Sequence, residues 1–280
     1  MTSELPGSST PASPLDRIDT SVVHPARRYN YWLGGKDNFQ ADRESGDQMV
    51  AHFPSIRTAA LENRRFLRRA VAHLARSAGV RQFLDIGTGI PTADNTHEVA
   101  QAVAPESRVV YVDNDPIVLA HARALLTSSA QGATAYIDAD LRDPERILGH
   151  PELLRTLDLS RPVALMLVAI LHFVPDRDDP YGVVARLLDA LPSGSYLVAS
   201  HGTYDHLPPE KVEAARLSAN GGPHGTIVLR SHQEFAAFFT GLELLDPGLP
   251  SVAEWRAEEE PQPRPSTAVV GMYGGVARKP

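Results

Sequence analysis

The sequence predicts an α/β fold, in which a mostly parallel sheet carries helices on both faces. From Gly79 onward, short apolar runs alternate with segments of helical periodicity, a pattern typical of a parallel sheet. One of these runs, "VALMLVAIL" at 163–171, is apolar at every position, as expected for a central strand buried on both sides. We therefore expect one sheet-centred domain after an N-terminal region of different character.

Residues 21–78 form that N-terminal region, and they show little strand character. Its clearest helix is 58–79, whose apolar positions follow the helical period and which Gly79 is placed to end. The preceding residues, 1–20, are rich in Ser, Thr and Pro and are expected to be a disordered tail. The predicted organisation is thus a tail at 1–20, a helical extension at 21–78 and a sheet-containing domain at 79–280.

The elements of the sheet-containing domain follow from its apolar runs. Five strands are expected at 82–87, 108–113, 134–139, 163–171 and 195–200, with helices between them at about 92–103, 116–127, 144–156 and 180–191. Pro116 suits the first turn of a helix, where a missing N–H does no harm. Two further helices, at about 207–219 and 231–240, precede two final strands at 242–249 and 267–279. The acidic, proline-rich segment between those strands is expected to be a solvated loop.

The composition excludes several classes of function. The 280 residues contain no cysteine, which rules out disulfides, zinc–thiolate sites and thiol nucleophiles. A formal net charge of -7 does not favour attraction of nucleic acid or of an anionic membrane. The four arginines between Asn63 and Arg69 fit a solvated helix face better than a nucleic-acid patch. No apolar run reaches the roughly 18 residues needed to cross a bilayer, and the N-terminus lacks a secretory pattern, so we expect a cytoplasmic protein without nucleic-acid or membrane partners.

The stretch "FLDIGTGIPT", residues 83–92, is the most informative in the chain. A predicted strand ends there in Asp85, Gly87 and Gly89 before a helix, and glycines at such a turn let a ligand approach the backbone closely. The dinucleotide pattern G-x-G-x-x-G fails, because Thr92 occupies the third glycine position. Asp85 directly before the glycines suits a ligand with positive charge rather than a diphosphate.

Acidic residues also follow the next two predicted strands. Asp113 lies 24 residues beyond Gly89, where a carboxylate can accept hydrogen bonds from both ribose hydroxyls. Asp140 could accept from an exocyclic amine, and the N–H of Leu141 could donate to a ring nitrogen. The carboxyl ends of parallel strands share one edge of the sheet, where ligands bind in open α/β folds. These residues predict a nucleoside ligand with a cationic end and no phosphate.

Four segments, "FLDIGTG", "VVYVDNDP", "YIDADLRD" and "LVAILHFVPD", resemble in order and spacing the motifs of Rossmann-like (class I) S-adenosylmethionine-dependent methyltransferases. This resemblance covers residues 80–200. It implies that the two final strands complete a seven-stranded, mostly parallel Rossmann-like sheet whose last strand is antiparallel. From about residue 21, "YNYWLGGKDNFQADRE" followed by "RQFLDIGTGIPT" is similar to an actinomycete S-adenosyl methyltransferase family that has an N-terminal LGGKDNF loop and unassigned substrates.

The resemblance implies a function and a cofactor. The function is methyl transfer to an unidentified acceptor, expected to be a small molecule. The cofactor is S-adenosyl-L-methionine, and the product is S-adenosyl-L-homocysteine. No metal is expected, because the acidic residues at 176–179 fit a solvated turn better than a metal site. The positions that match the family's cofactor site are Asp85, Gly87 and Gly89 for the methionine part, Asp113 for the ribose, Asn114 beside the adenine, Asp140 and Leu141 for the adenine edge, and Val168 and Ala169 for the methionine amine.

Two histidines are candidates for a general base, which methyl transfer needs only when the acceptor is a poorly nucleophilic hydroxyl or amine. His172 ends the fourth predicted strand, next to the expected methyl group, and His201 ends the fifth. Histidine titrates near neutral pH and can therefore serve as a base. The alternative for His172 is a packing role or a hydrogen bond to the backbone.

The stretch "YNYWLGGKDNF", residues 29–39, does not stand between a strand and a helix and so is not a phosphate loop. We expect it to fold over the crevice as a lid that covers the methionine end of the cofactor and forms one wall of the acceptor site. The side chains of the right type to meet the methionine carboxylate are Tyr31, Lys36, Asn38 and Arg64. The alternative is a structural turn.

Two other functions are compatible with parts of the sequence. A protein that binds S-adenosylmethionine or S-adenosylhomocysteine in a regulatory or partner role would share the cofactor residues but have no turnover. A nicotinamide-dependent oxidoreductase is less consistent with the sequence, because the third glycine is missing and no Tyr-x-x-x-Lys pair stands on a helix. Fold alone does not separate these classes. We make no prediction of the oligomeric state.

Overall fold

One mixed sheet of seven strands organises the structure, a computed structural model that describes residues 18–280 apart from 126–127, 211 and 214–225. The strands are β1 (Gln82–Ile86), β2 (Arg108–Asp113), β3 (Ala133–Asp138), β4 (Ala164–Val168), β5 (Tyr196–Gly202), β6 (Glu243–Leu244) and β7 (Met272–Arg278). They lie in the order β3-β2-β1-β4-β5-β7-β6. β1 to β5 run parallel, and β7 runs antiparallel to both of its neighbours. This confirms the predicted seven-stranded, mostly parallel sheet with an antiparallel last strand.

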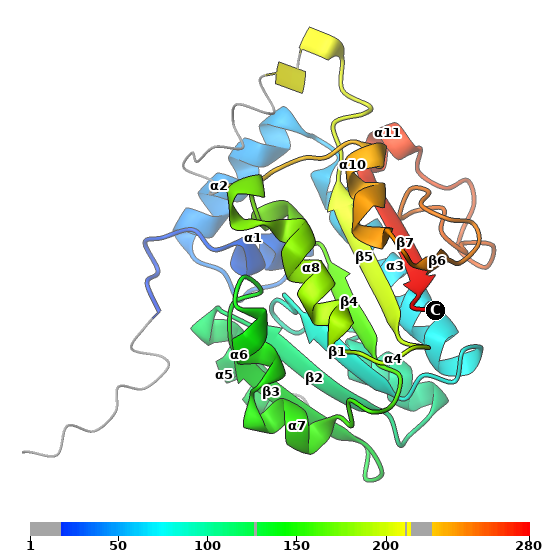
Figure 1. Ribbon diagram of the computed structural model, residues 1–280. Coiled ribbons are helices and arrows are strands. Elements are labelled where there is room, and N and C mark those ends of the chain that lie inside the picture. The colour runs from blue at the N-terminus through cyan, green and yellow to red at the C-terminus, as the bar shows by residue number, and fades with distance from the viewer. Residues whose placement is uncertain (1–17, 126–127, 211, 214–225) are drawn as a thin grey trace, which may run out of the picture.

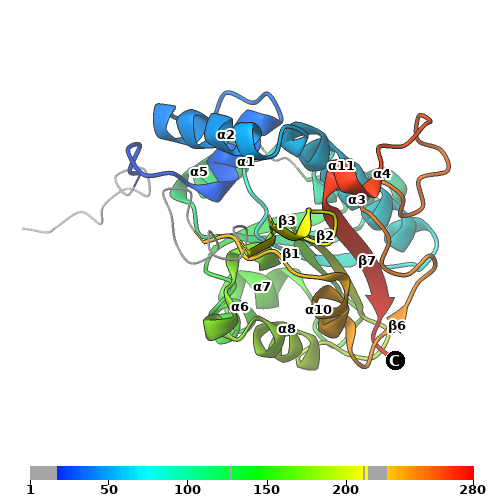
Figure 2. The same ribbon diagram turned by 90° about the horizontal axis from the view of Figure 1, so that it is seen from above.

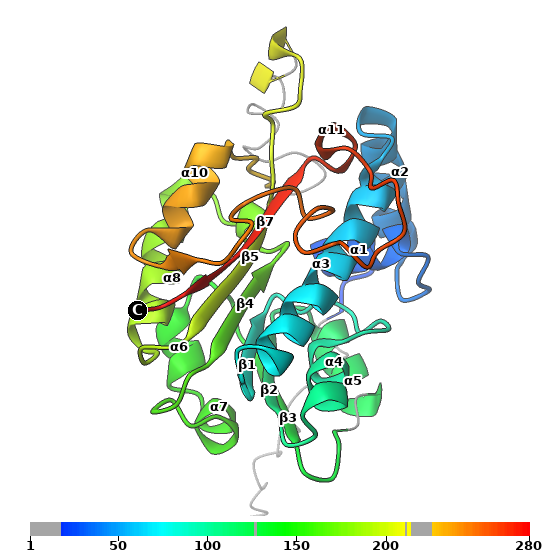
Figure 3. The same ribbon diagram turned by 90° about the vertical axis from the view of Figure 1, so that its right-hand side faces the viewer.

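Helices cover both faces of this sheet and give three layers (Figure 1, Figure 2). One face carries α3 (Ile56–Arg76), α4 (Thr96–Val103) and α5 (Pro116–Leu125). The opposite face carries α6 (Pro144–Leu148), α7 (Pro151–Thr156), α8 (Pro180–Asp189) and α10 (His232–Ala236), the last extended by a 3-10 helix over Ala237–Phe239 (Figure 3). Two more helices, α1 (Pro25–Trp32) and α2 (Gln40–His52), lie near the carboxyl ends of the parallel strands.

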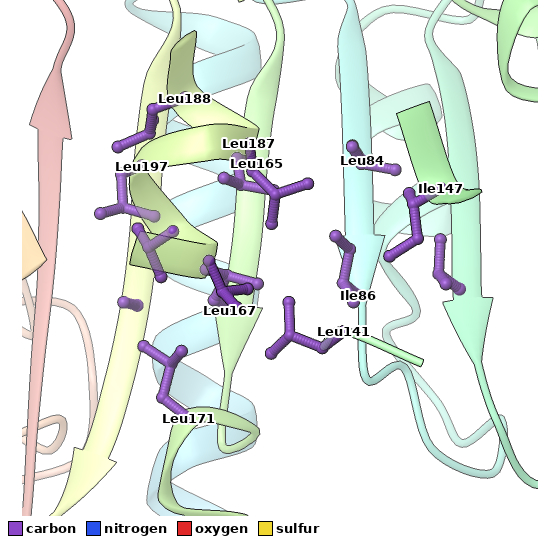
Figure 4. Packing of buried hydrophobic residues seen from close by; sticks show 14 of the residues in the cluster. Leu84, Ile86, Leu141, Ile147, Leu165, Leu167, Leu171, Leu187, Leu188 and Leu197 are labelled. Carbon is purple, nitrogen blue, oxygen red and sulfur yellow. The ribbon is translucent and has the colours of Figure 1, made fainter. Parts of the chain in front are cut away.

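The sheet divides the core into two apolar clusters. On β1, Leu84 and Ile86 belong to the cluster beneath α6, α7 and α8, whereas Phe83 belongs to the cluster beneath α3. This alternation is what the pleat of a strand requires. Figure 4 shows the first cluster, in which Leu187 of α8 packs beside Leu165 of β4.

The helix α3 belongs to the layers that cover the sheet. Phe66 and Leu74 are fully buried and pack with residues of β1, β2 and β4 in the second cluster. α3 therefore packs on the sheet although it belongs to the predicted extension at 21–78. The other two helices of that extension, α1 and α2, lie beyond the sheet. Ile18, the first described residue, packs against the small cluster around Ile90, and residues 1–17 of the predicted tail lie outside the described part of the chain.

The fourth strand is shorter than its apolar sequence predicts. β4 ends at Val168 instead of at residue 171, and Leu171–Phe173 form a short 3-10 helix. Ala169 ends the strand because its φ of 57° lies in the left-handed region, which is uncommon for a residue other than glycine. Apolar composition records burial rather than backbone geometry, so the sequence does not indicate this break.

Three other predicted elements are interrupted. The helix expected at 144–156 breaks at His150, because the residue before a proline is disfavoured in the helical region. The strand expected at 242–249 is reduced to β6, and the one expected at 267–279 begins with α11 (Thr267–Val270) before β7. Most of the helix expected at 207–219 lies outside the described residues.

The segment between β6 and β7 is not the solvated loop that its acidic composition predicts. Trp255 is fully buried there and packs edge-to-face on Phe66 of α3, with ring centroids 5.6 Å apart. Arg69 of α3 donates to the carbonyl oxygens of Val252 (2.6 Å) and Trp255 (2.8 Å), and to Glu260 (3.2 Å). The arginine run that was expected to be a solvated helix face therefore contributes to holding this segment against the sheet layers.

Candidate active site

The first element of the site is the turn that follows β1. Asp85, near the end of that strand, is 4% exposed and accepts a hydrogen bond of 2.6 Å from Thr96 Oγ1. Burial raises the pKa of its carboxyl to about 6, against the opposing effects of Thr96 and of the Arg64 charge. The carboxylate is short of compensating charge, and a cationic ligand group would stabilise it.

The two glycines of this turn have separate roles. Gly87 has a φ of 76°, its N–H donates to the carbonyl of Val112 (2.8 Å), and a Cβ there would lie 2.6 Å from Ile170. Gly89 has a φ of 68°, and a Cβ there would meet no atom of the described chain within 4 Å. Packing therefore requires glycine at position 87, whereas Gly89 presents its backbone to open space.

Asp113, at the end of β2, holds the glycine turn in place. Its Oδ2 accepts from the N–H of Gly89 (2.8 Å), and its Oδ1 accepts from the N–H of Asp115 (2.9 Å). Burial raises the pKa of the Asp113 carboxyl, although both N–H groups oppose the rise. A carboxylate oxygen has two acceptor positions, so Asp113 can also accept from a ligand while it fixes the turn.

Asp140, which follows β3, is held by its own neighbours. Arg142 donates to both of its oxygens, from Nη2 to Oδ2 (2.7 Å) and from Nε to Oδ1 (2.9 Å), and Asn114 Nδ2 donates to Oδ2 (2.9 Å). The hydrogen bonds from Arg142 lower the pKa of Asp140 to about 2. Leu141 buries its side chain in the core. The structure thus brings Asn114 and Asp140 together and adds Arg142, which its position two residues after Asp140 could have indicated.

A narrow crevice separates α1 from the glycine turn. Its lining residues come from α1, α3 and the turn after β1: Ala26, Tyr29, Asn30, Leu33, Arg64, Thr88, Gly89, Ile90 and Thr92. Arg64 Nη2 donates to the carbonyls of Ala93 (3.0 Å) and Asp94 (3.2 Å) on the opposite wall. A second hollow along the edge strand β3, lined by Thr134, Tyr136 and His150 among others, shares none of these residues. Asp113 adjoins the crevice beside Gly89, because its Oδ2 accepts from the Gly89 N–H.

The predicted lid residues do not all face this crevice. Tyr31 donates its hydroxyl to Asp47 of α2 (2.7 Å), and Lys36 is exposed. Asn38 is buried, but its Nδ2 donates to Asn30 Oδ1 (3.0 Å) and to the Gly35 carbonyl (2.9 Å), so it braces the loop itself. Of the four side chains expected to meet the methionine carboxylate, Arg64 alone lines the crevice. Side-chain type indicated what these residues could bind, but not the direction in which they point.

The helix α1 is anchored to the turn after β2 by contacts that the sequence does not indicate. Arg27 Nε donates to Asp115 Oδ2 (3.1 Å), and His24 Nδ1 lies 3.0 Å from the same oxygen. Asp115 is fully buried. Burial raises the pKa of its carboxyl, but the hydrogen bond and charge of His24 and the charge of Arg27 outweigh this effect and leave the pKa lowered. Because Asp115 lies two residues beyond Asp113, this contact joins the N-terminal extension to the site.

The two candidate bases differ in what their ring nitrogens contact. His201 is fully buried, its Nδ1 lies 2.7 Å from the Gly202 carbonyl, and its Nε2 lies 2.9 Å from Arg230 Nη1. The carbonyl can only accept and the guanidinium can only donate, so His201 is neutral, protonated on Nδ1, and has no free lone pair. A general-base role for His201 stays a prediction, and it would require His201 to give up one of these two contacts.

His172 lies beyond β4 in the short 3-10 helix. It is partly exposed as a residue, but its Nδ1 is buried and has no hydrogen-bond partner among the described residues. Burial and the charges of Arg28 and Arg230 lower the pKa of His172 to about 3. Its ring is therefore neutral near pH 7, and Nδ1 has an unused hydrogen-bonding position.

The described residues contain no group of three His, Asp or Glu side chains placed to hold a metal ion. Within the same residues, no helix combines the length and the apolar character that crossing a membrane requires.

A family model described as S-adenosyl methyltransferase matches residues 11–280. The chain belongs to the S-adenosyl methyltransferase family. Its activity is accordingly S-adenosylmethionine-dependent methyl transfer, as the strand-end motifs predict. A comparison with functionally curated proteins gave no match.

Solved structures agree with this assignment of the methyltransferase. A DUF574 family protein from Streptomyces avermitilis is 53% identical, with 94% of this chain and 100% of that chain covered and a TM-score of 0.87. A methyltransferase candidate from Thermobifida fusca is 43% identical, with 97% and 99% covered and a TM-score of 0.84. An O-methyltransferase family protein from Burkholderia thailandensis is 15% identical, with 86% and 62% covered and a TM-score of 0.52, a likeness of fold alone. The predicted Rossmann-like methyltransferase fold is confirmed.

Proposed function

We propose that this methyltransferase binds S-adenosylmethionine in the crevice between α1 and the carboxyl ends of β1 to β4. The main support is the arrangement of three acids, Asp85, Asp113 and Asp140, which stand at or just beyond the carboxyl ends of the neighbouring parallel strands β1, β2 and β3. Between them, Gly89 has a positive φ and open space where a Cβ would be. Three carboxylate acceptors around a glycine turn suit a nucleoside with a cationic end, and they offer no cradle for phosphate.

The methionine end is assigned to Asp85 and Arg64. Asp85 is a buried carboxylate whose pKa is raised by burial, and the amine and sulfonium of the cofactor would stabilise its charged form. Arg64 lines the crevice and its charge acts on Asp85, so it is the side chain suited to the methionine carboxylate. The backbone at Val168 and Ala169 lies beyond Asp85 at the end of the adjacent strand.

The ribose and adenine are assigned to the ends of β2 and β3. Asp113 has acceptor capacity beyond its two backbone contacts, which suits the ribose hydroxyls. Asp140 stays ionised because Arg142 lowers its pKa. Its two oxygens already accept four hydrogen bonds, so the adenine amine would bind there by displacing one donor, such as Asn114. Asn114, which donates to Asp140, would lie beside the ring.

The lid is assigned to α1 and the loop that follows it. Tyr29, Asn30 and Leu33 line the crevice opposite Gly89, and the anchoring of Arg27 to Asp115 holds α1 in this position. When bound, the cofactor supplies a methyl group activated by its sulfonium. The residues of the chain hold that group, exclude water and orient the acceptor.

The acceptor side is assigned to the region of His172. Its Nδ1 is buried without a partner among the described residues, so a small movement of the side chains around it would let it accept a hydrogen bond from a hydroxyl or an amine, or donate one in the other tautomer. With a pKa of about 3, His172 orients an acceptor better than it removes a proton from it. A small-molecule acceptor and a cytoplasmic location stay predictions from the sequence.

Isothermal titration with S-adenosylhomocysteine tests the cofactor assignment. Asp113→Asn should weaken binding about tenfold or more, because hydrogen bonds to a charged group contribute about 1.5–3 kcal/mol. Asp138→Asn is the matched control, since Asp138 also ends a strand but lines the hollow at β3; it should change the affinity less than about twofold. A wild-type protein that does not bind would overturn the proposal, and equal losses in the two variants would overturn the role of Asp113.

A further inference from the structure

We propose that Tyr29, Asn63 and Ser200 form a hydrogen-bonded relay that positions α1 over the crevice and fixes the backbone at the end of β4. The inference rests on the proposed cofactor site. It goes beyond that site because the polar groups of the relay act on one another and on the backbone, and not on the cofactor. Tyr29, Asn63 and Ser200 are therefore positioning residues.

The relay begins at the break after β4. The N–H of Ala169 donates to Ser200 Oγ on β5 (2.9 Å), and Ser200 Oγ donates to Asn63 Oδ1 on α3 (2.6 Å). Asn63 Nδ2 then donates to the Tyr29 hydroxyl on α1 (3.1 Å), which donates to the carbonyl of Ala60 on α3 (2.8 Å). One chain of hydrogen bonds thus joins β4, β5, α3 and α1.

The direction of every hydrogen in the relay is determined. The carbonyl of Ala60 can only accept, so the Tyr29 hydroxyl donates to it and must accept from the NH₂ group of Asn63. The amide oxygen of Asn63 then faces Ser200, whose hydroxyl donates to it while its oxygen accepts from the N–H of Ala169. Ser200 is fully buried and Asn63 is 1% exposed, so water cannot readily replace a lost partner. Burial raises the pKa of Tyr29, which keeps its hydroxyl protonated. Removal of one member leaves the next unsatisfied or reoriented.

The two ends of the relay lie where the cofactor site needs fixed geometry. Ala169 holds a left-handed φ of 57°, a conformation that persists only when its surroundings stabilise it, and Ser200 supplies such a contact. At the other end, the Tyr29 residue lines the crevice while its hydroxyl is bonded to α3. The relay therefore makes the position of the lid helix and the backbone at the end of β4 depend on each other.

A second buried serine provides a matched control. Ser195 is also fully buried, and its Oγ accepts from the N–H of Val163 (3.2 Å). Val163 lies just before β4, at the opposite end of the strand from Ala169. Ser200→Ala and Ser195→Ala each remove one buried hydroxyl that accepts from a backbone N–H, but Ser200 alone belongs to the relay.

The first test measures S-adenosylhomocysteine binding by isothermal titration of the full chain, with thermal unfolding measured in parallel. Ser200→Ala and Tyr29→Phe should each raise Kd about fivefold to tenfold, the effect of about one net hydrogen bond. Ser195→Ala should lower the melting temperature but leave Kd within about twofold. The double variant Ser200→Ala/Tyr29→Phe should lose less affinity than the sum of the single losses, because the relay acts as a unit.

The second test measures hydrogen exchange of residues 25–32 without any ligand. Exchange should be faster in Ser200→Ala and Tyr29→Phe than in Ser195→Ala, because α1 is held less firmly. Equal Kd values and equal exchange in all three variants would overturn the relay and leave its members as ordinary core contacts. If the wild-type protein does not bind S-adenosylhomocysteine, the proposed cofactor site fails, and the exchange comparison still decides whether the relay holds α1.

Discussion

Replacement of Asp85 by asparagine should stabilise the free protein at neutral pH while it weakens cofactor binding. Asp85 is 4% exposed, and its main polar contact is a hydrogen bond from Thr96. Asparagine has the same shape and keeps an oxygen that can accept from Thr96. The substitution therefore removes the buried charge and leaves the packing in place.

The magnitude follows from the pKa of this carboxyl. Burial raises it from an ordinary value of 3.8 to about 6 in the folded protein. Each pKa unit corresponds to about 1.36 kcal/mol, so ionised Asp85 lowers the free energy of unfolding by about 3 kcal/mol above pH 6. Since the folded-state pKa is the higher one, the stability contributed by the neutral form is complete below about pH 4 and is lost as the pH rises through 6.

Urea unfolding followed by circular dichroism, at about pH 4 and about pH 7.5, measures the effect. Asp85→Asn should be more stable than the wild type by up to about 3 kcal/mol at the higher pH and equal to it at the lower pH. Isothermal titration should show weaker binding of S-adenosylmethionine, because the carboxylate no longer meets the cationic end of the ligand.

Asp115→Asn is the matched control, with the opposite sign. Asp115 is also a buried aspartate, in the turn after β2, but its pKa is lowered. The hydrogen bond and charge of His24, the N–H of Ile117 and the charge of Arg27 together outweigh the effect of burial. This variant should lose stability at neutral pH, and the loss should shrink as the pH falls through the folded-state pKa. If Asp85→Asn instead destabilises the protein at pH 7.5, or if its gain does not decrease toward pH 4, the argument from buried charge is refuted.

Three further substitutions test other parts of the structure. His172 should not titrate above about pH 5 in proton NMR spectra, because burial and the charges of Arg28 and Arg230 lower its pKa to about 3. The variant His172→Asn assigns its ring signals, and a titration midpoint near the ordinary value of 6.5 would contradict the prediction. Trp255→Ala should lower the free energy of unfolding, measured by urea titration, by about 3–5 kcal/mol, because the side chain is fully buried. A loss below about 1 kcal/mol would show that the segment between β6 and β7 is loosely packed. Ala169→Gly should leave the melting temperature unchanged or raise it, whereas Ala169→Val should lower it. The φ of 57° at position 169 suits glycine and disfavours a branched side chain. A valine variant with a higher melting temperature than the glycine variant would contradict the left-handed conformation.

Most of the sheet could be predicted from the sequence, because its signals are local. The alternation of apolar runs and helical segments predicts the layers, and the all-apolar run at 163–171 predicts a central strand. The break at Ala169 and the burial of Trp255 could not be predicted in the same way. Each depends on partners distant in the sequence, such as Arg69, whose side chain donates to the Trp255 carbonyl 186 residues away.

The site shows the same division between local and distant signals. Acids that directly follow strands must share one edge of a parallel sheet, so Asp85 and Asp113 could be placed from the sequence. The side-chain types of Tyr31 and Asn38 predict contacts with a ligand, but their hydrogen-bonding groups bind Asp47 and the loop itself. The relay through Ser200 depends on the relative placement of four elements, which no local pattern encodes.

The packing of the segment between β6 and β7 against α3 has a consequence for how the chain folds. Phe66 and Arg69 leave the ribosome long before Trp255 and Val252, which cover them. A nascent chain that stops before residue 250 has the sheet's central strands and still exposes one side of α3. Synthesis order and packing order are therefore opposed for this contact, and a fragment that ends before residue 250 would leave the apolar side of α3 uncovered.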